Sequence, residues 1–96
     1  MSASGTEGGA PRPRRWRDAQ GEHIDVRGLP RPQPLVAILR LVHQLGDSGA
    51  TVIVHIDREP MALYPELAEL GWTAELLSEN ASADADEVLL RLERGP

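Results

Sequence analysis

The sequence predicts an α/β two-layer sandwich in which two helices cover one face of a four-stranded mixed sheet, in the order β-α-β-α-β-β. Three observations support this fold class. Four short segments have the apolar pattern of strands, two segments between them repeat apolar residues at helical spacing, and glycines, prolines or polar residues separate the segments. A chain of 96 residues is expected to form one domain.

The first 20 residues are rich in Arg, Pro and Gly, and Trp16 is their only aromatic residue. Such a segment buries too little surface to offset its ordering entropy, so residues 1–20 are predicted to be a disordered tail before a folded domain at residues 21–96. The tail carries a net charge of +2, and the rest of the chain carries −7. The tail is interpreted either as a basic arm for RNA, DNA or an acidic partner, or as an extension without a role.

The first half of the folded part contains a strand, a loop and a helix. Residues 23–27 alternate polar and apolar side chains, which is the pattern of a strand with one buried face. Residues 28–34 contain three prolines and are predicted to be an extended loop, and Pro34 suits the first turn of a helix. The helix runs to residue 45 and is expected to bury an apolar stripe, formed by Leu35, Ile38, Leu39, Val42 and Leu45.

The second half contains a strand, a helix and two strands. Residues 50–56 are β-branched and nearly all apolar, as in a central strand parallel to the first one. A shorter helix follows, with Gly71 as its C-terminal cap and a stripe of leucines, Leu63, Leu67 and Leu70. Residues 72–77 and 87–93 are predicted to be the last two strands, and residues 78–86 a polar loop between them.

Three aliphatic residues of these strands point away from the predicted helices. Ile53, Leu77 and Leu89 form a docking patch if they gather on the open face of the sheet. The alternative is that they are isolated aliphatic side chains of the kind that most sheets expose.

The segment at residues 24–35 reads Ile-Asp-Val-Arg-Gly-Leu-Pro-Arg-Pro-Gln-Pro-Leu. It resembles the signature of the TusA/SirA-like sulfur-carrier superfamily, which is an apolar-Asp-x-x-Gly-Leu segment followed by Cys-Pro-x-Pro at the start of a helix. Five positions match this signature, Asp25, Gly28, Leu29, Pro32 and Pro34. The resemblance covers about residues 22–94 and implies the sulfur-carrier fold in a bacterial, cytoplasmic protein.

A second stretch narrows the resemblance. Residues 57–60 read Asp-Arg-Glu-Pro and are followed by Leu63 and Tyr64. This stretch resembles more closely a branch known only as a domain of unknown function, whose members often lie near hemerythrin-like domains. Where the family has its sulfur-carrying cysteine, this chain has Arg31, and the sequence contains no cysteine. A persulfide needs a thiolate, so the resemblance implies the fold and not sulfur transfer.

The carboxyl ends of the two parallel strands are the predicted binding site. In open α/β sheets ligands commonly bind there, and helix N-termini favour anions. The candidate residues for an anion or a partner protein are Arg27, Gly28, Arg31 and Arg58, and the residues expected to organise the loops are Asp25, Pro32, Pro34 and Asp57. The alternative is that Arg27 and Arg58 pair with the nearby carboxylates and only order the loops.

A metal site is a second hypothesis. Its candidate ligands are two histidines and two aspartates of the parallel strands, His23, Asp25, His55 and Asp57. No His-x-His or Glu-x-x-His spacing requires a metal, so these residues are otherwise polar side chains on the open face. His43 is interpreted as a boundary or surface residue of the first helix, and no cofactor is expected.

Nothing in the sequence indicates an enzyme. Ser78 and Ser82 have no nearby histidine, no Gly-x-Ser-x-Gly segment is present, and the acids Asp84, Asp86 and Glu87 are interpreted as a solvated turn. No apolar stretch is long enough to span a membrane or to serve as an export signal.

The leading hypothesis is a non-catalytic binding or docking module for another protein or a small anion, present as a monomer or weak dimer. The acidic body disfavours nucleic acid. Two alternatives remain open: a metal- or redox-linked accessory protein that uses His23, Asp25, His55 and Asp57, and an RNA-associated protein that binds through its Arg-rich tail.

Overall fold

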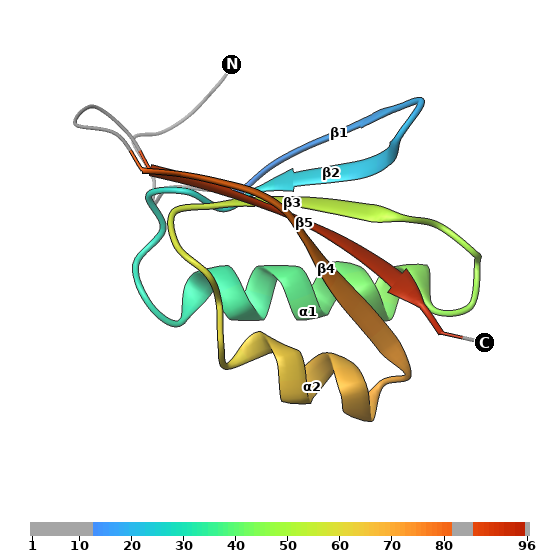
Figure 1. Ribbon diagram of the computed structural model, residues 1–96. Coiled ribbons are helices and arrows are strands. Elements are labelled where there is room, and N and C mark those ends of the chain that lie inside the picture. Colours follow the sequence, from blue (N-terminus) through green and yellow to red (C-terminus); the bar gives the residue numbers. More distant parts are fainter. Residues whose placement is uncertain (1–12, 82–85, 96) are drawn as a thin grey trace, which may run out of the picture.

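The computed structural model describes residues 13–81 and 86–95, and it places two helices on one face of a mixed sheet (Figure 1). The elements in chain order are β1 (Arg14–Asp18), β2 (Gly21–Asp25), α1 (Gln33–Leu45), β3 (Val52–Ile56), α2 (Leu63–Glu69), β4 (Trp72–Ala81) and β5 (Asp86–Arg94). The strand order is β1-β2-β3-β5-β4. The predicted α/β class with two helices is therefore confirmed, but the sheet has five strands and not four.

β1 is the strand that the sequence pattern did not predict. It pairs antiparallel with β2 at the sheet edge, and Trp16 lies opposite His23. All its other side chains are exposed, so it has no alternation of apolar and polar residues. Main-chain hydrogen bonds and the Trp16 ring hold it instead. The predicted disorder is wrong for residues 14–18, and residues 1–12 lie outside the described residues.

β2 and β3 form the parallel pair that the sequence predicts, with Ile24 opposite Val54 and Asp25 opposite His55. β3 also pairs antiparallel with β5, which makes β3 the central strand. In parallel strands the carboxyl ends lie at the same edge of the sheet. The loops that follow β2 and β3 therefore start side by side.

The hydrophobic core fills the space between the sheet and the helices. β2, β3 and β5 contribute fully buried aliphatic side chains such as Ile24, Val54 and Leu90. α1 contributes Ile38, Leu41 and Val42, and α2 contributes Leu63 and Leu67. The buried stripe of α1 therefore differs from the predicted one. Leu41 is buried in addition to Ile38 and Val42, whereas the predicted members Leu35, Leu39 and Leu45 are only partly buried.

The β4–β5 hairpin is longer than the sequence predicts. β4 continues to Ala81 and β5 starts at Asp86, so the predicted polar loop shrinks to residues 82–85, which lie outside the described residues. The polar residues of this segment continue the two strands, because antiparallel pairing of β4 with β5 satisfies the backbone N–H and C=O groups of these residues. The pairing register shifts between Leu76 and Ser78.

The predicted aliphatic patch does not form on the open face. Ile53 is only 4% exposed and Leu89 is half-buried, whereas Leu77 is 41% exposed beside the register shift. Neighbouring side chains cover the central strand, so these three residues do not make one accessible surface. The described part of the chain contains no helix of the length and hydropathy that a membrane span requires.

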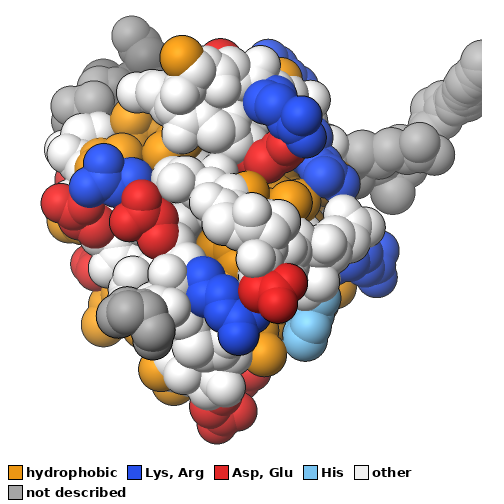
Figure 2. All heavy atoms as spheres, turned by 90° about the vertical axis from the view of Figure 1, so that its right-hand side faces the viewer, with side chains coloured by type: hydrophobic (Ala, Val, Ile, Leu, Met, Phe, Trp, Pro, Cys, Tyr) orange, Lys and Arg blue, Asp and Glu red, His pale blue; other side chains and the backbone are white. Residues whose placement is uncertain are grey.

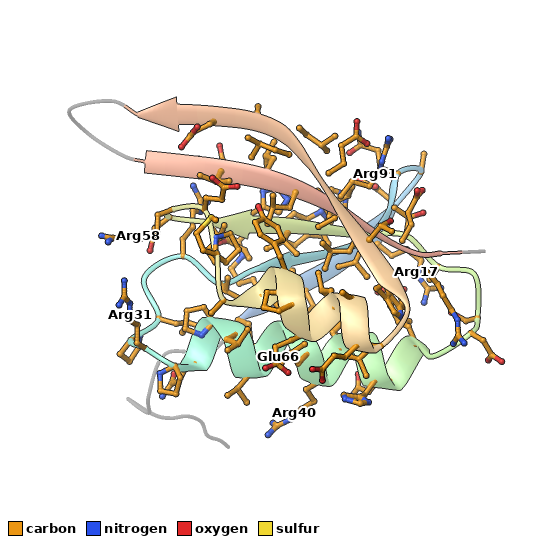
Figure 3. The ribbon with its side chains drawn as sticks, turned by 60° about the horizontal axis from the view of Figure 1, so that its bottom comes forward. Arg17, Arg31, Arg40, Arg58, Glu66 and Arg91 are labelled. Atoms are coloured by element: carbon orange, nitrogen blue, oxygen red, sulfur yellow. The ribbon has the colours of Figure 1, made fainter. Side chains whose placement is uncertain are left out.

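Charged side chains are distributed differently at the two ends of the sheet. At the end where β1 turns into β2, blue arginines lie beside red carboxylates (Figure 2). Ion pairs there include Arg17 with Glu22 and Arg91 with Glu75. Arg31 and Arg58 project from the opposite end of the molecule (Figure 3).

Candidate functional site

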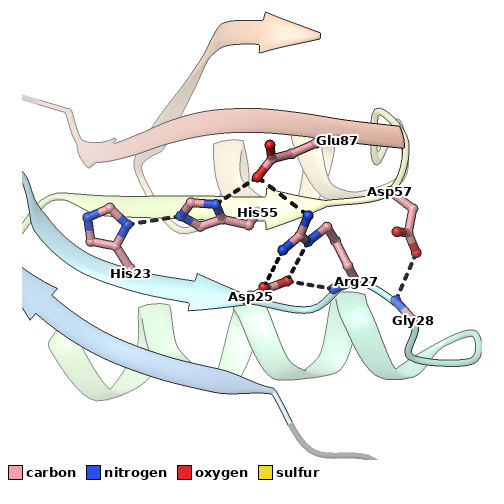
Figure 4. Close-up of polar contacts among 7 residues, drawn as sticks. All are labelled: His23, Asp25, Arg27, Gly28, His55, Asp57 and Glu87. Atoms are coloured by element: carbon pink, nitrogen blue, oxygen red, sulfur yellow. Dashed lines mark hydrogen bonds and ion pairs between the residues drawn. The ribbon is translucent and has the colours of Figure 1, made fainter. Parts of the chain in front are cut away.

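Two hydrogen bonds join the segment after β2 to the end of β3 and to the loop that follows β3. The Val26 amide donates to the His55 carbonyl at 2.9 Å. The Gly28 amide donates to Asp57 Oδ2 at 2.9 Å (Figure 4). The first bond continues the parallel ladder, and the second ties one loop to the other. Asp57 therefore organises the site through the backbone of Gly28.

Arg27 is held by carboxylates at this edge. Its Nε and Nη2 donate to the two carboxyl oxygens of Asp25 at 3.0 and 2.9 Å, and its Nη1 lies 3.7 Å from Glu87 Oε2. The Arg27 guanidinium lowers the pKa of Asp25, and Asp25 in turn raises the pKa of Arg27. A forked pair of this kind occupies the donors that an external anion needs.

Arg31 and Arg58 line a pocket of about 490 Å³ between the two loops. Arg31 belongs to the loop before α1 and Arg58 to the loop before α2, and both side chains are exposed. Figure 3 shows them on the same side of the molecule, pointing away from the core. The apolar wall of the pocket is formed by Leu29, Pro34, Leu35, Ile56, Met61 and Leu63.

Two carboxylates also line the pocket, but each has a partner elsewhere. Asp57 accepts the Gly28 amide, and Glu59 Oε2 accepts a hydrogen bond from the Tyr64 hydroxyl at 2.8 Å. Burial, and then the hydrogen bond and negative charge of Glu59, raise the pKa of Tyr64 to about 12. Neither Arg31 nor Arg58 forms an ion pair with another described residue.

The lining of the pocket combines charged side chains with apolar surface. This lining contains no hydroxyl, imidazole or thiol among the described residues. α1 begins beside it with no acidic residue in its first turn and no side-chain cap. Two guanidinium groups beside an apolar wall suit an anionic group carried on an apolar body. Of the four predicted anion-site residues, Arg31 and Arg58 are thus available, whereas Arg27 and the Gly28 amide already have partners.

The four candidate metal ligands do not converge. His23 and His55 contact each other on the open face, Asp25 pairs with Arg27, and Asp57 accepts the Gly28 amide (Figure 4). Within residues 13–81 and 86–95, no group of three or more His, Asp or Glu side chains is arranged to hold a metal ion.

The remaining candidates lie apart from the pocket. His43 is exposed on α1, as predicted, and Ser78 lies in β4. Ser82 and Asp84 lie outside the described residues. Of the arginines of the predicted tail, three belong to β1, where Arg17 pairs with Glu22, Arg15 donates to Gln44 and Arg14 stacks over Trp16.

Sequence reasoning missed the contact between His23 and His55 and the part that Met61 has in the pocket. Met61 follows Pro60 in a turn and is 66% exposed, the largest exposed fraction of any large apolar side chain among the described residues. Its position after the Asp-Arg-Glu-Pro turn was the only signal available. The histidine contact depends on strand register, for which the sequence carries no local signal.

Comparisons with known proteins agree with this architecture. Residues 23–84, more than half of the chain, match the family described as "Uncharacterized conserved protein (DUF2249)". Among solved structures, the SirA-like protein of Desulfitobacterium hafniense is similar with a TM-score of 0.61 and 21% sequence identity. The match covers 77% of this chain and 97% of that one. No curated protein matches the chain. The predicted resemblance is therefore confirmed at the level of family and fold.

Proposed function

The chain belongs to the DUF2249 family, and we propose that this member is a non-catalytic binding module whose pocket holds an anionic group of its ligand between Arg31 and Arg58. The ligand class is a carboxylate, phosphate or sulfur oxyanion, either free or carried by an acidic segment of a partner protein. The apolar wall favours an anion that is attached to an apolar group.

One observation carries this proposal. The two arginines come from loops that follow different strands, yet they line one pocket, and neither forms an ion pair with a described carboxylate. Ion pairs engage other arginines of the chain, including Arg17, Arg27 and Arg91. Two exposed cations beside apolar surface gain most when an external anion is bound.

The absence of cysteine limits the chemistry that is proposed. A sulfur carrier forms a persulfide on a thiolate, and this chain has no thiol in its sequence. Arg31 occupies the position at which the TusA/SirA-like proteins have their sulfur-carrying cysteine. A guanidinium group cannot form a persulfide. Binding through charge is therefore the role that fits this residue.

The proposal is tested by titrating sulfate, thiosulfate or phosphate into labelled protein and following backbone amide signals. We expect saturable shifts at Gly28, Arg31 and Arg58 in the wild-type protein. Arg31→Ala and Arg58→Ala should each abolish them. Arg40→Ala is the matched control, because Arg40 is exposed on α1 and far from the pocket (Figure 3), and it should leave the shifts unchanged.

A second arm identifies the source of the anion. A short peptide with alternating acidic and leucine residues replaces the inorganic anions in the same titration. Shifts with the peptide alone would indicate an acidic partner segment, and shifts with inorganic anions would indicate a small ligand. If neither probe shifts these amides at millimolar concentration, or if both variants bind as well as the wild type, the proposed site is wrong.

A further inference from the structure

Two imidazole rings lie in direct contact on the open face of the sheet, away from the pocket. His23 Nδ1 on β2 and His55 Nε2 on β3 are 3.0 Å apart (Figure 4). The side chains of His23 and His55 are only 5% and 16% exposed. The Trp16 ring stacks on His23 at 4.9 Å between ring centres, and its centre lies 5.1 Å from that of His55.

The outer nitrogen of each ring faces a carboxylate. His23 Nε2 lies 2.9 Å from Asp18 Oδ1, and His55 Nδ1 lies 3.2 Å from Glu87 Oε2. Asp18, His23, His55 and Glu87 come from β1, β2, β3 and β5 in that order. A single row of hydrogen bonds therefore crosses four neighbouring strands.

The number of protons in this row follows from the hydrogen bonds. An ionised carboxylate only accepts, so each outer nitrogen has to carry a hydrogen. The contact between the rings needs one further hydrogen, on either His23 Nδ1 or His55 Nε2. Two neutral imidazoles carry one hydrogen each, so the complete row requires one additional proton.

Nearby charges are compatible with this additional proton. Asp18 and Glu87 supply a negative charge at each end of the row. A hydrogen bond from the Gln20 amide, with a contribution from His23, lowers the pKa of Asp18 and so favours its ionised form. The Arg27 cation also approaches Glu87, but Asp25 pairs with Arg27. The Arg14 cation lies over the Trp16 ring, 5.5 Å from the ring centre.

We propose that His23 and His55 together form a proton-binding site that holds one positive charge shared between the two rings and fastens β1 to the sheet. When the site loses this proton, one of the three hydrogen bonds is lost. When it gains another, two N–H groups face each other across the inner contact and that bond is lost. The row is therefore complete only between two protonation steps. This inference does not depend on the proposed pocket, because none of the four residues of the row lines that pocket.

The test is a pH titration of the full chain with ¹⁵N-labelled histidine, in which long-range proton–nitrogen spectra report the state of each ring nitrogen. We expect the pair to take up protons in two separate steps and to hold three ring protons between them. His43 is the internal control, since it is exposed on α1, and it should titrate in one step. If His23 and His55 each titrate independently in one step, as His43 does, the proposal is wrong.

The attachment of β1 is the second measurement. Hydrogen-exchange protection of the amides in residues 14–18 should be greatest between the two steps and fall about fivefold on either side, as expected for the loss of one hydrogen bond. The indole signal of Trp16 should shift at both steps. A protection factor that is constant across both steps would overturn the link to β1.

Two variants separate the pair from its surroundings. In His55→Gln, His23 should titrate in one step, whereas His43→Gln should leave both steps unchanged. Asp18→Asn should move the uptake of the third proton to lower pH, because an amide stabilises a neighbouring cation less than a carboxylate does. If His55→Gln leaves two steps at His23, the charge is not shared.

Discussion

Arg27 and Asp25 are two residues apart at the end of β2, and they form a forked ion pair with N–O distances of 3.0 and 2.9 Å. The Asp25 carboxylate also accepts the Arg27 backbone amide at 3.1 Å. The side chain of Asp25 is 10% exposed and that of Arg27 is 37% exposed. The pair thus fixes the turn out of β2, and it leaves Arg31 and Arg58 as the cations that face the pocket.

Arg27→Gln should destabilise the protein in a pH-dependent way. Because Arg27 lowers the pKa of Asp25, the stabilisation is present above the ordinary aspartate value of 3.8 and is lost as pH falls through the lower folded value. We expect the free energy of unfolding to fall by about 1 kcal/mol at neutral pH. The loss is small because solvent around Arg27 screens the ion pair. Urea unfolding near neutral pH and in acid checks this, and an equal loss under both conditions would contradict it.

Gly21→Ala should destabilise the turn between β1 and β2. Gly21 has φ +132°, and an added Cβ would lie 2.4 Å from the Thr51 carbonyl oxygen. The Glu22 amide donates to the same oxygen at 2.8 Å, so the backbone there cannot retreat without loss. We expect a cost of about 2–4 kcal/mol in the free energy of unfolding.

The matched control for that change is Gly49→Ala. Gly49 also has a positive φ, +85°, but an added Cβ meets nothing within 4 Å. It should cost only about 1–2 kcal/mol, which is the conformational penalty alone. Equal losses for the two variants in chemical unfolding would show that the approach to Thr51 is not limiting.

Ile38→Ala should reveal which face of α1 is buried. Ile38 is 0% exposed in the core, so the cavity should cost about 2–5 kcal/mol. Val36→Ala, two residues earlier and 46% exposed, should change stability by less than about 0.5 kcal/mol. Thermal unfolding of both variants decides this, and similar melting temperatures would mean that the helix face is assigned wrongly.

Glu59→Gln should lower the pKa of Tyr64 below its value of about 12, since it removes the negative charge beside the hydroxyl. Burial of the Tyr64 hydroxyl should still hold its pKa above the ordinary tyrosine value of 10.0. The stabilisation linked to the raised pKa is present below pH 10.0 and is lost as pH rises through about 12. Tyr64 is the only tyrosine, so tyrosinate absorbance measures it directly. Identical midpoints in the variant and the wild type would contradict the contact.

Trp16→Ala should weaken the edge of the sheet by about 1–3 kcal/mol through lost burial and lost stacking on His23. For a domain of this size that corresponds to a fall in melting temperature of several degrees. Arg14→Ala is the control, because the Arg14 side chain is exposed and contacts the same ring, and it should have a small effect. A negligible effect of Trp16→Ala would show that β1 is held by its backbone alone.

The sequence by itself determined the two helices, the four strands from β2 onward and the parallel pairing of β2 with β3. Burial leaves a local pattern in the sequence, either as residues at helical spacing, such as Ile38 and Val42 of α1, or as a short apolar run, as in β3, which is buried on both faces. The loop between β2 and α1 was equally visible, because its prolines exclude a helix. The candidate arginines could therefore be placed at the correct edge of the sheet.

Tertiary structure alone decided the rest. β1 buries little and is held by pairing with β2, so its arginine-rich sequence has no strand periodicity of its own. Which arginines face the pocket depended on where Asp25 and Glu87 lie in space, and Glu87 is 60 residues beyond Arg27. The contact of His23 with His55 required the register of two strands that lie 32 residues apart. Periodicity reports burial within one segment, whereas these contacts join distant segments, and only the packed sheet brings them together.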